Sequence, residues 1–119
     1  MIKKIRRQFE ETKGKKRHRF DDFDPIVRRC FKDYAHLFPK QHVNKDGSRF
    51  VYHPNVEGLT EISLEKEHGS REFVPYYYAK LAMLRIEELI SFIETHPNPE
   101  DGRHEDTDDD DPGGADQGP

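Results

Sequence analysis

The sequence predicts an α+β fold in which one helix is followed by a three-stranded antiparallel β-meander and a long C-terminal helix. Apolar residues recur at helical spacing before residue 38 and after residue 75, and between these stretches β-prone runs flank an Asp-Gly dipeptide. Residues 24–96 hold most of the large apolar side chains. We therefore expect one α+β domain over 24–96, a basic N-terminal arm over 1–23 and a disordered acidic tail over 97–119.

The arm is expected to become helical only where it docks on another surface. Ile2, Ile5 and Phe9 stand three and four residues apart, which would align them on one side of a short helix within residues 1–11. Such a short helix is marginal in water by itself. Residues 12–19 combine a glycine with a block of cations and should form a flexible basic linker.

The first helix of the domain is expected to run from Pro25 to about Phe38. Asp24 can cap the free backbone N–H groups, Pro25 fits a first turn, and Pro39 cannot continue the hydrogen-bond ladder. The single cysteine, Cys30, is expected as a small buried side chain, with a reactive thiol as the alternative. The stripe that should face the core is Ile26, Val27, Cys30, Phe31, Tyr34, Leu37 and Phe38.

Two β-prone runs on either side of residues 46–47 predict a hairpin with an Asp-Gly turn of type I′. This register would set Val43 opposite Phe50 and Gln41 opposite Tyr52. Because side chains alternate along a strand, the other face should carry five side chains. These are His42, Asn44, Arg49, Val51 and His53.

A third strand is predicted over residues 59–66, where Ile62 and Leu64 alternate with polar side chains. The last helix should begin at Pro75 and continue to about Thr95, before further prolines stop it. Its apolar stripe at steps of three and four is Tyr76, Ala79, Met83, Ile86, Ile90 and Ile93.

The charges are sorted along the chain. Residues 1–19 carry nine Lys/Arg against two Glu, and residues 100–119 carry nine Asp/Glu against one Arg. The stretch between them is mildly acidic, and the net charge of the whole chain is −4. Such asymmetry is typical of a chain with one end that contacts a polyanion, and the acidic end could also fold back on the basic one.

The predicted order of elements is that of double-stranded RNA-binding domains and of the HicA-type small RNase toxins built on the same fold. Gly47-Ser48-Arg49, followed by Tyr52-His53-Pro54, resembles the second-strand segment of HicA-type toxins. In that family a Gly-Ser-His is followed by an aromatic residue and often by His-Pro. Arg49 stands where the family has its catalytic histidine, so the resemblance implies the fold or an RNA contact rather than cleavage.

A second stretch looks like the final helix of double-stranded RNA-binding domains. It consists of Ala-Lys-Leu-Ala at residues 79–82 and Glu-Leu at residues 88–89. Those domains normally carry a lysine cluster at the start of this helix, and here that place is taken by Tyr76, Tyr77 and Tyr78. One or two of the tyrosines should remain exposed, and the run is interpreted either as an amphipathic lid on the core or as a stacking or protein-contact surface.

Histidines are the candidate acid–base groups. Were the chain an enzyme, His53 or His68 would be the general base, and His42 would share a face with His53. The alternative is that these are ordinary exposed histidines. No His pair stands at helical i, i+4 spacing and no Cys pair exists, so neither a metal site nor a cofactor is expected.

The polar string at residues 65–72 has two interpretations. Its alternating charges are typical of a solvated loop with weak surface ion pairs. Alternatively, Lys66, His68, Ser70 and Arg71 could present hydrogen-bond donors to phosphate groups between the third strand and the last helix.

We therefore expect a small non-catalytic module that binds RNA or another polyanion through its arm. Alternatives are a protein-interaction or assembly module, such as a homodimer, and a HicA-like RNase. No apolar run approaches the roughly 18 residues that span a bilayer, so we expect no membrane partner and a cytoplasmic protein. The candidate polyanion contacts are Lys3, Lys4, Arg6, Arg7, Lys13, Lys15, Lys16, Arg17 and Arg19 in the arm, assisted by Arg49, Lys66 and Arg71.

Overall fold

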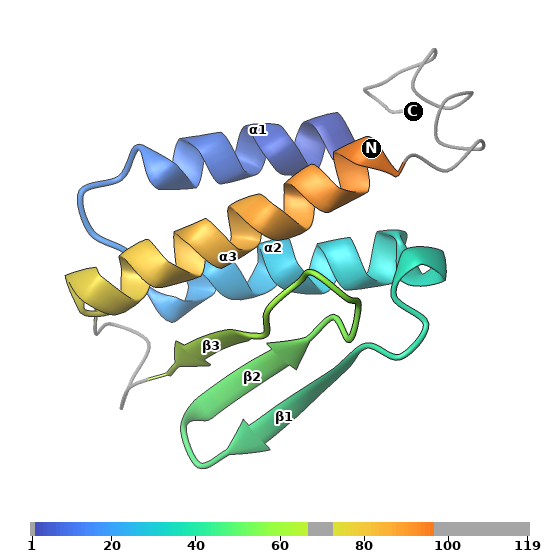
Figure 1. The fold of residues 1–119 in the computed structure, drawn as a ribbon. Helices are drawn as coiled ribbons and strands as arrows, with labels where there is room; N and C mark the ends of the chain where they lie inside the picture. Colours follow the sequence, from blue (N-terminus) through green and yellow to red (C-terminus); the bar gives the residue numbers. More distant parts are fainter. Residues whose placement is uncertain (1, 67–72, 97–119) are drawn as a thin grey trace.

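A computed structural model of the 119-residue chain describes residues 2–66 and 73–96 (Figure 1). It confirms the α+β class and the order of helix, antiparallel meander and long helix. The expected disordered tail lies outside the described residues. The elements are α1 (Ile2–Lys13), α2 (Phe20–Asp33), a 3-10 turn η1 (Ala35–Leu37), β1 (His42–Asp46), β2 (Arg49–His53), β3 (Ile62–Glu65) and α3 (Tyr76–Thr95).

The three helices lie together on one face of a sheet whose strand order is β1-β2-β3 (Figure 1). Ile5 and Phe9 of α1 are fully buried in the same hydrophobic core as the apolar faces of α2, α3 and the sheet. The apolar stripe of the arm thus finds its docking surface within the chain. Burial of these two side chains is what stabilises so short a helix.

The segment expected as a flexible linker is shorter and more ordered than predicted. α1 continues to Lys13, and Arg19 already pairs with Phe73 in an isolated β-bridge. Between them, His18 is 6 % exposed, and its Nε2 lies 2.7 Å from the Thr12 carbonyl oxygen. This contact and the β-bridge hold the loop between α1 and α2 against the core. The run of cations in the loop did not indicate that it would pack in this way.

α2 begins at Phe20 rather than at Pro25. The carboxylate of Asp22 accepts the backbone N–H of Arg19 at 2.8 Å and the ammonium of Lys15 at 2.7 Å. Burial opposes the ionisation of Asp22, but these two hydrogen bonds outweigh it and lower its pKa. The helix starts five residues before the expected position, because Asp22, the third residue of α2, accepts the backbone N–H of the N-cap residue Arg19.

The regular part of α2 ends at Asp33, before the expected end at about Phe38. The 3-10 turn that follows still buries Tyr34 and Phe38 completely, as the apolar stripe predicted. The ring of Phe38 lies 5.5 Å from that of Phe31 and 5.8 Å from that of Phe92. The tighter turn therefore directs Phe38 between α2 and α3.

The predicted hairpin register was wrong by two residues. Val43 pairs with Tyr52, and the turn consists of Gly47 and Ser48. Gly47 has φ of +65°, as the first central residue of a type II′ turn requires, whereas a turn at Asp46 would need a positive φ there too. Because the shift is even, the predicted outer face is retained: His42, Asn44, Arg49, Val51 and His53 still share it.

β3 is shorter than predicted, but Ile62 and Leu64 point into the core as expected. α3 ends at Thr95 as predicted and begins at Tyr76, one residue after the predicted start, with Pro75 as its N-cap; its buried face is Ala79, Ala82, Ile86, Leu89, Ile90 and Ile93. Tyr76 was expected in this stripe, yet it is 73 % exposed. No helix among the described residues is both long and apolar enough to cross a membrane.

Candidate functional site

Four cationic side chains gather around three phenylalanines at one end of the molecule. The loop between α1 and α2, the turn between β1 and β2 and the start of α3 all lie at this end (Figure 1). The set, named here the cation–aromatic surface, comprises Arg17, Arg19, Lys45, Lys66, Phe20, Phe50 and Phe73.

Phe73 positions the two arginines. The backbone N–H of Val74 donates to the carbonyl of His18 at 2.7 Å, which holds Phe73 beside Arg19. The guanidinium carbons of Arg17 and Arg19 lie 4.9 and 4.8 Å from the centroid of the Phe73 ring, within the range of cation–π attraction. Phe73 remains 39 % exposed as a residue, and both arginines are exposed beside it.

Phe20 and Phe50 position the two lysines. Their ring centroids are 4.9 Å apart at the end of the core. The Nζ of Lys66 lies 5.5 Å from the centroid of Phe20, and that of Lys45 lies 5.5 Å from the centroid of Phe50. The backbone N–H of Lys66 also donates to the carbonyl of Ser48 at 2.7 Å. Packed rings thus fix the lysine stems while both ammonium groups stay exposed.

None of these four cations forms an ion pair with a carboxylate in residues 2–66 and 73–96. Arg49 lies next to the surface on the outer face of β2, opposite Asp46 and Glu65 in the strand register. The hydroxyl of Ser48 donates to the Glu65 carboxylate at 3.3 Å. Among the described residues, the cation–aromatic surface therefore carries four cations without a carboxylate partner, and Arg49 lies beside it opposite two acidic residues in the strand register.

Three of the cations that were predicted to contact a polyanion form ion pairs with carboxylates of this chain instead. Arg6 binds Glu87 at 2.7 Å and Glu94 at 2.8 Å, and Lys13 lies 3.7 Å from Glu87. The hydrogen bonds that Arg6 donates lower the pKa of Glu87 to about 2, and the acceptance of these bonds by Glu94 and Glu87 raises the pKa of Arg6. Lys15 is the third, paired with Asp22.

The remaining predicted cations are spread over the surface. Lys3, Lys4 and Arg7 are exposed on α1, and Lys16 is exposed in the loop after it. Lys3 and Lys4 stand at the start of α1, at the other end of that helix from Arg17 and Arg19 (Figure 1). Arg71, His68 and Ser70 fall outside the described residues.

The interpretation of the tyrosines as a lid on the core was wrong. Tyr76, Tyr77 and Tyr78 are 73 %, 70 % and 56 % exposed. Helical geometry explains this, because Ala79 and Ala82 already bring the start of α3 against the core. All three rings are thus available to a partner.

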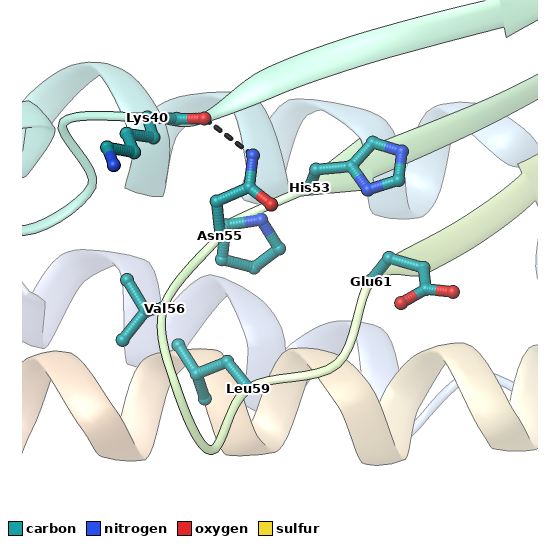
Figure 2. A pocket seen from close by; sticks show the side chains of 7 residues that line it. Lys40, His53, Asn55, Val56, Leu59 and Glu61 are labelled. Carbon is teal, nitrogen blue, oxygen red and sulfur yellow. Dashed lines mark hydrogen bonds between the residues drawn. The ribbon is translucent and has the colours of Figure 1, made fainter.

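The predicted proximity of His42 and His53 is confirmed. Their rings stack with centroids 4.4 Å apart at 15°. Nδ2 of Asn44 lies 3.2 Å from Nε2 of His53, and Nδ2 of Asn55 lies 3.1 Å from Nδ1 of His42. Asn55 also donates to the carbonyl of Lys40 at 2.7 Å (Figure 2). The two imidazoles are thus held as a pair by asparagine side chains.

His53 of this pair, but not His42, lines a pocket of about 420 Å³. In Figure 2, His53 and Glu61 lie on one side and Val56 and Leu59 on the other. The ionisable side chains of the lining are Lys40, His53 and Glu61, and the lining has no hydroxyl or thiol nucleophile. The described residues contain no group of three or more His, Cys, Asp or Glu that could hold a metal ion. The lining residues are Lys40, His53, Pro54, Asn55, Val56, Leu59 and Glu61.

Sequence reasoning missed Lys45, Phe20, Phe50 and Phe73 as members of the cation–aromatic surface. The bridge between Arg19 and Phe73 joins distant parts of the chain and has no local signature. Of these four residues, only Lys45 could have been predicted from the sequence pattern. It comes just before the predicted turn and lies on the same face of the hairpin as Phe50.

Comparison with known proteins returned no match, whether with family models, with curated proteins or with solved structures. The resemblances to double-stranded RNA-binding domains and HicA-type toxins stay predictions.

Proposed function

We propose that this protein is a non-catalytic RNA-binding module whose contact area is the cation–aromatic surface. The observation that carries the proposal is the cluster of four exposed cations, none of them paired with a described carboxylate, around rings that fix their positions. Phosphates bound there would release counterions without displacing a carboxylate of the described residues.

The exposure of Phe73 favours RNA as the ligand over a polyanion that has no bases. The residue is 39 % exposed, and its ring is flanked by two guanidinium groups. Unpaired bases stack on aromatic rings and on arginine planes, and such stacking contributes roughly 1–3 kcal/mol per base. We therefore expect a preference for single-stranded over duplex RNA, in a cytoplasmic setting that suits a single unpaired cysteine.

The test is fluorescence anisotropy of the full chain with a short single-stranded RNA over a range of salt concentrations. Replacing Arg17 and Arg19 together by Ala should flatten the slope of log affinity against log salt by about 1.4, since each phosphate contact on a single strand contributes about 0.7. Phe73→Ala should weaken binding to single-stranded RNA by roughly tenfold at an unchanged slope.

The matched control is the double substitution of Lys3 and Lys4 by Ala, which removes the same charge from the other end of α1. It should change the slope by less than the arginine pair does. Equal effects of the two pairs would contradict a localised site, and salt-insensitive or absent RNA binding would contradict the proposal as a whole.

A further inference from the structure

The outward side of α3 carries an apolar line that the fold does not cover. Tyr77, Leu81 and Leu84 are 70 %, 38 % and 51 % exposed. Their spacings of four and three place them along one side of the helix, and Glu88 continues the line after four more residues. We name this set of four residues the outer face of α3. It lies opposite the buried side that contains Ile86.

We propose that the outer face of α3 binds the same face of a second copy of this chain, with the two helices antiparallel. A two-fold interface must be complementary to itself, because each copy presents the same patch. Here Leu84 is the centre, Lys80 stands four residues before it and Glu88 four residues after it. Antiparallel pairing about Leu84 brings Lys80 of each copy to Glu88 of the other.

Parallel pairing would have the opposite electrostatic result. It would set Lys80 against Lys80 and Glu88 against Glu88, which is destabilising. The Nζ of Lys80 lies 5.7 Å from the centroid of the Tyr76 ring, and Oε1 of Glu88 lies 3.3 Å from Nη1 of Arg85. Both charged groups are therefore positioned beside the apolar line. The balance of charge along this face also favours a protein partner over RNA.

The interface is small. From Tyr77 to Glu88 the line covers about 17 Å of helix, at a rise of 1.5 Å per residue. This length corresponds to the low end of specific interface sizes, so we expect a concentration-dependent dimer. With the two-fold axis at Leu84, the two starts of α3 are about 24 Å apart along the axis. The two cation–aromatic surfaces would then lie at opposite ends of the pair.

Sedimentation velocity of the full chain over a range of concentrations tests the oligomeric state. A dimer is expected, and Leu84→Asp should shift it to monomer at the same concentration with an unchanged circular dichroism spectrum. Lys80→Glu should weaken association at least several-fold, and adding Glu88→Lys to that variant should restore it. A monomer at all concentrations, or a dimer unaffected by Leu84→Asp, overturns the proposal.

Thiol crosslinking tests the orientation. Leu84→Cys should crosslink to itself with a short bismaleimide, because the two copies of this residue meet at the axis. Tyr77→Cys is the matched control and should not, since its copies would lie about 21 Å apart along the helix axis. Cys30 is buried and should give no background in the unmodified chain. Preferential crosslinking of Tyr77→Cys would show parallel pairing and overturn the proposal.

Discussion

Asp24 illustrates how a single side chain joins two elements. It was expected to cap a helix, but its carboxylate lies within α2, where it accepts the hydroxyl of Tyr52 at 2.5 Å and Nε of Arg28 at 2.7 Å. Burial raises the pKa of the Tyr52 phenol, and the hydrogen bond to Asp24 raises it further. Tyr52 therefore stays protonated over the usual pH range and ties β2 to α2.

Tyr52→Phe should lower the free energy of unfolding by about 1.5–3 kcal/mol, because a hydrogen bond to a charged acceptor is lost while the buried ring is kept. Urea denaturation measures the change. Tyr78→Phe is the control, since its side chain is 56 % exposed, and it should stay within about 0.5 kcal/mol of the parent. Equal midpoints for the two variants would show that the bond to Asp24 contributes nothing.

At the scale of elements, one arginine joins α1 to α3. Arg6 donates to both carboxylate oxygens of Glu87 and to both of Glu94, and it also lies 3.1 Å from Glu10. Bidentate pairs of this kind are stronger and more directional than single contacts. The side chain of Glu87 is 37 % exposed, so solvent screens the attraction in part.

This network predicts a defined pH dependence. The pKa of Glu87 is lowered from 4.5 to about 2 by Arg6, so its stabilisation is complete above pH 4.5 and is lost as the pH falls towards 2. Thermal unfolding should show Glu87→Gln less stable than the parent at neutral pH, with a difference that shrinks across this window. Glu57→Gln is the control, because Glu57 is exposed in the loop between β2 and β3, outside α1 and α3. A difference that is constant with pH would exclude the ion pair as its cause.

At the scale of the whole molecule, α1 shares one core with the α2–sheet–α3 unit. Phe9 is fully buried, and α1 contacts both α2 and α3. Small domains with a common core usually unfold in one cooperative step. The chain should therefore lose all three helices together.

Phe9→Ala should lower the free energy of unfolding of the entire chain by about 3–5 kcal/mol, because it leaves a cavity among the helices. Arg7→Ala, an exposed change on the same helix, should have little effect. Denaturation followed by far-ultraviolet circular dichroism and by tyrosine fluorescence should give coincident curves. If Phe9→Ala left the midpoint of the tyrosine signal unchanged, α1 would be an independent arm.

The sequence predicted what depends on local pattern and missed what depends on distant partners. The bounds of α3 followed from its apolar period and its flanking prolines, and the faces of the hairpin followed from alternation. The register failed because the sequence allowed two turns around Gly47. Arg6 was assigned to a polyanion because its acidic partners come from α3, more than 80 residues later.

The candidate site was also predictable only in part from local sequence pattern. Its cationic residues could be named from composition, but Phe73 meets Arg17 and Arg19 only through tertiary packing. A list of cations therefore cannot separate those without a described carboxylate partner from those that Glu87 and Asp22 neutralise.

The buried thiol of Cys30 makes the chain its own reporter of unfolding. Burial, and secondarily Asp33, raises the pKa of this thiol to about 12, so the reactive thiolate is scarce at neutral pH while α2 is packed. A thiol reagent can therefore modify the native chain only when the core opens. The labelling rate, compared with that of the unfolded chain, measures the free energy of that opening without denaturant.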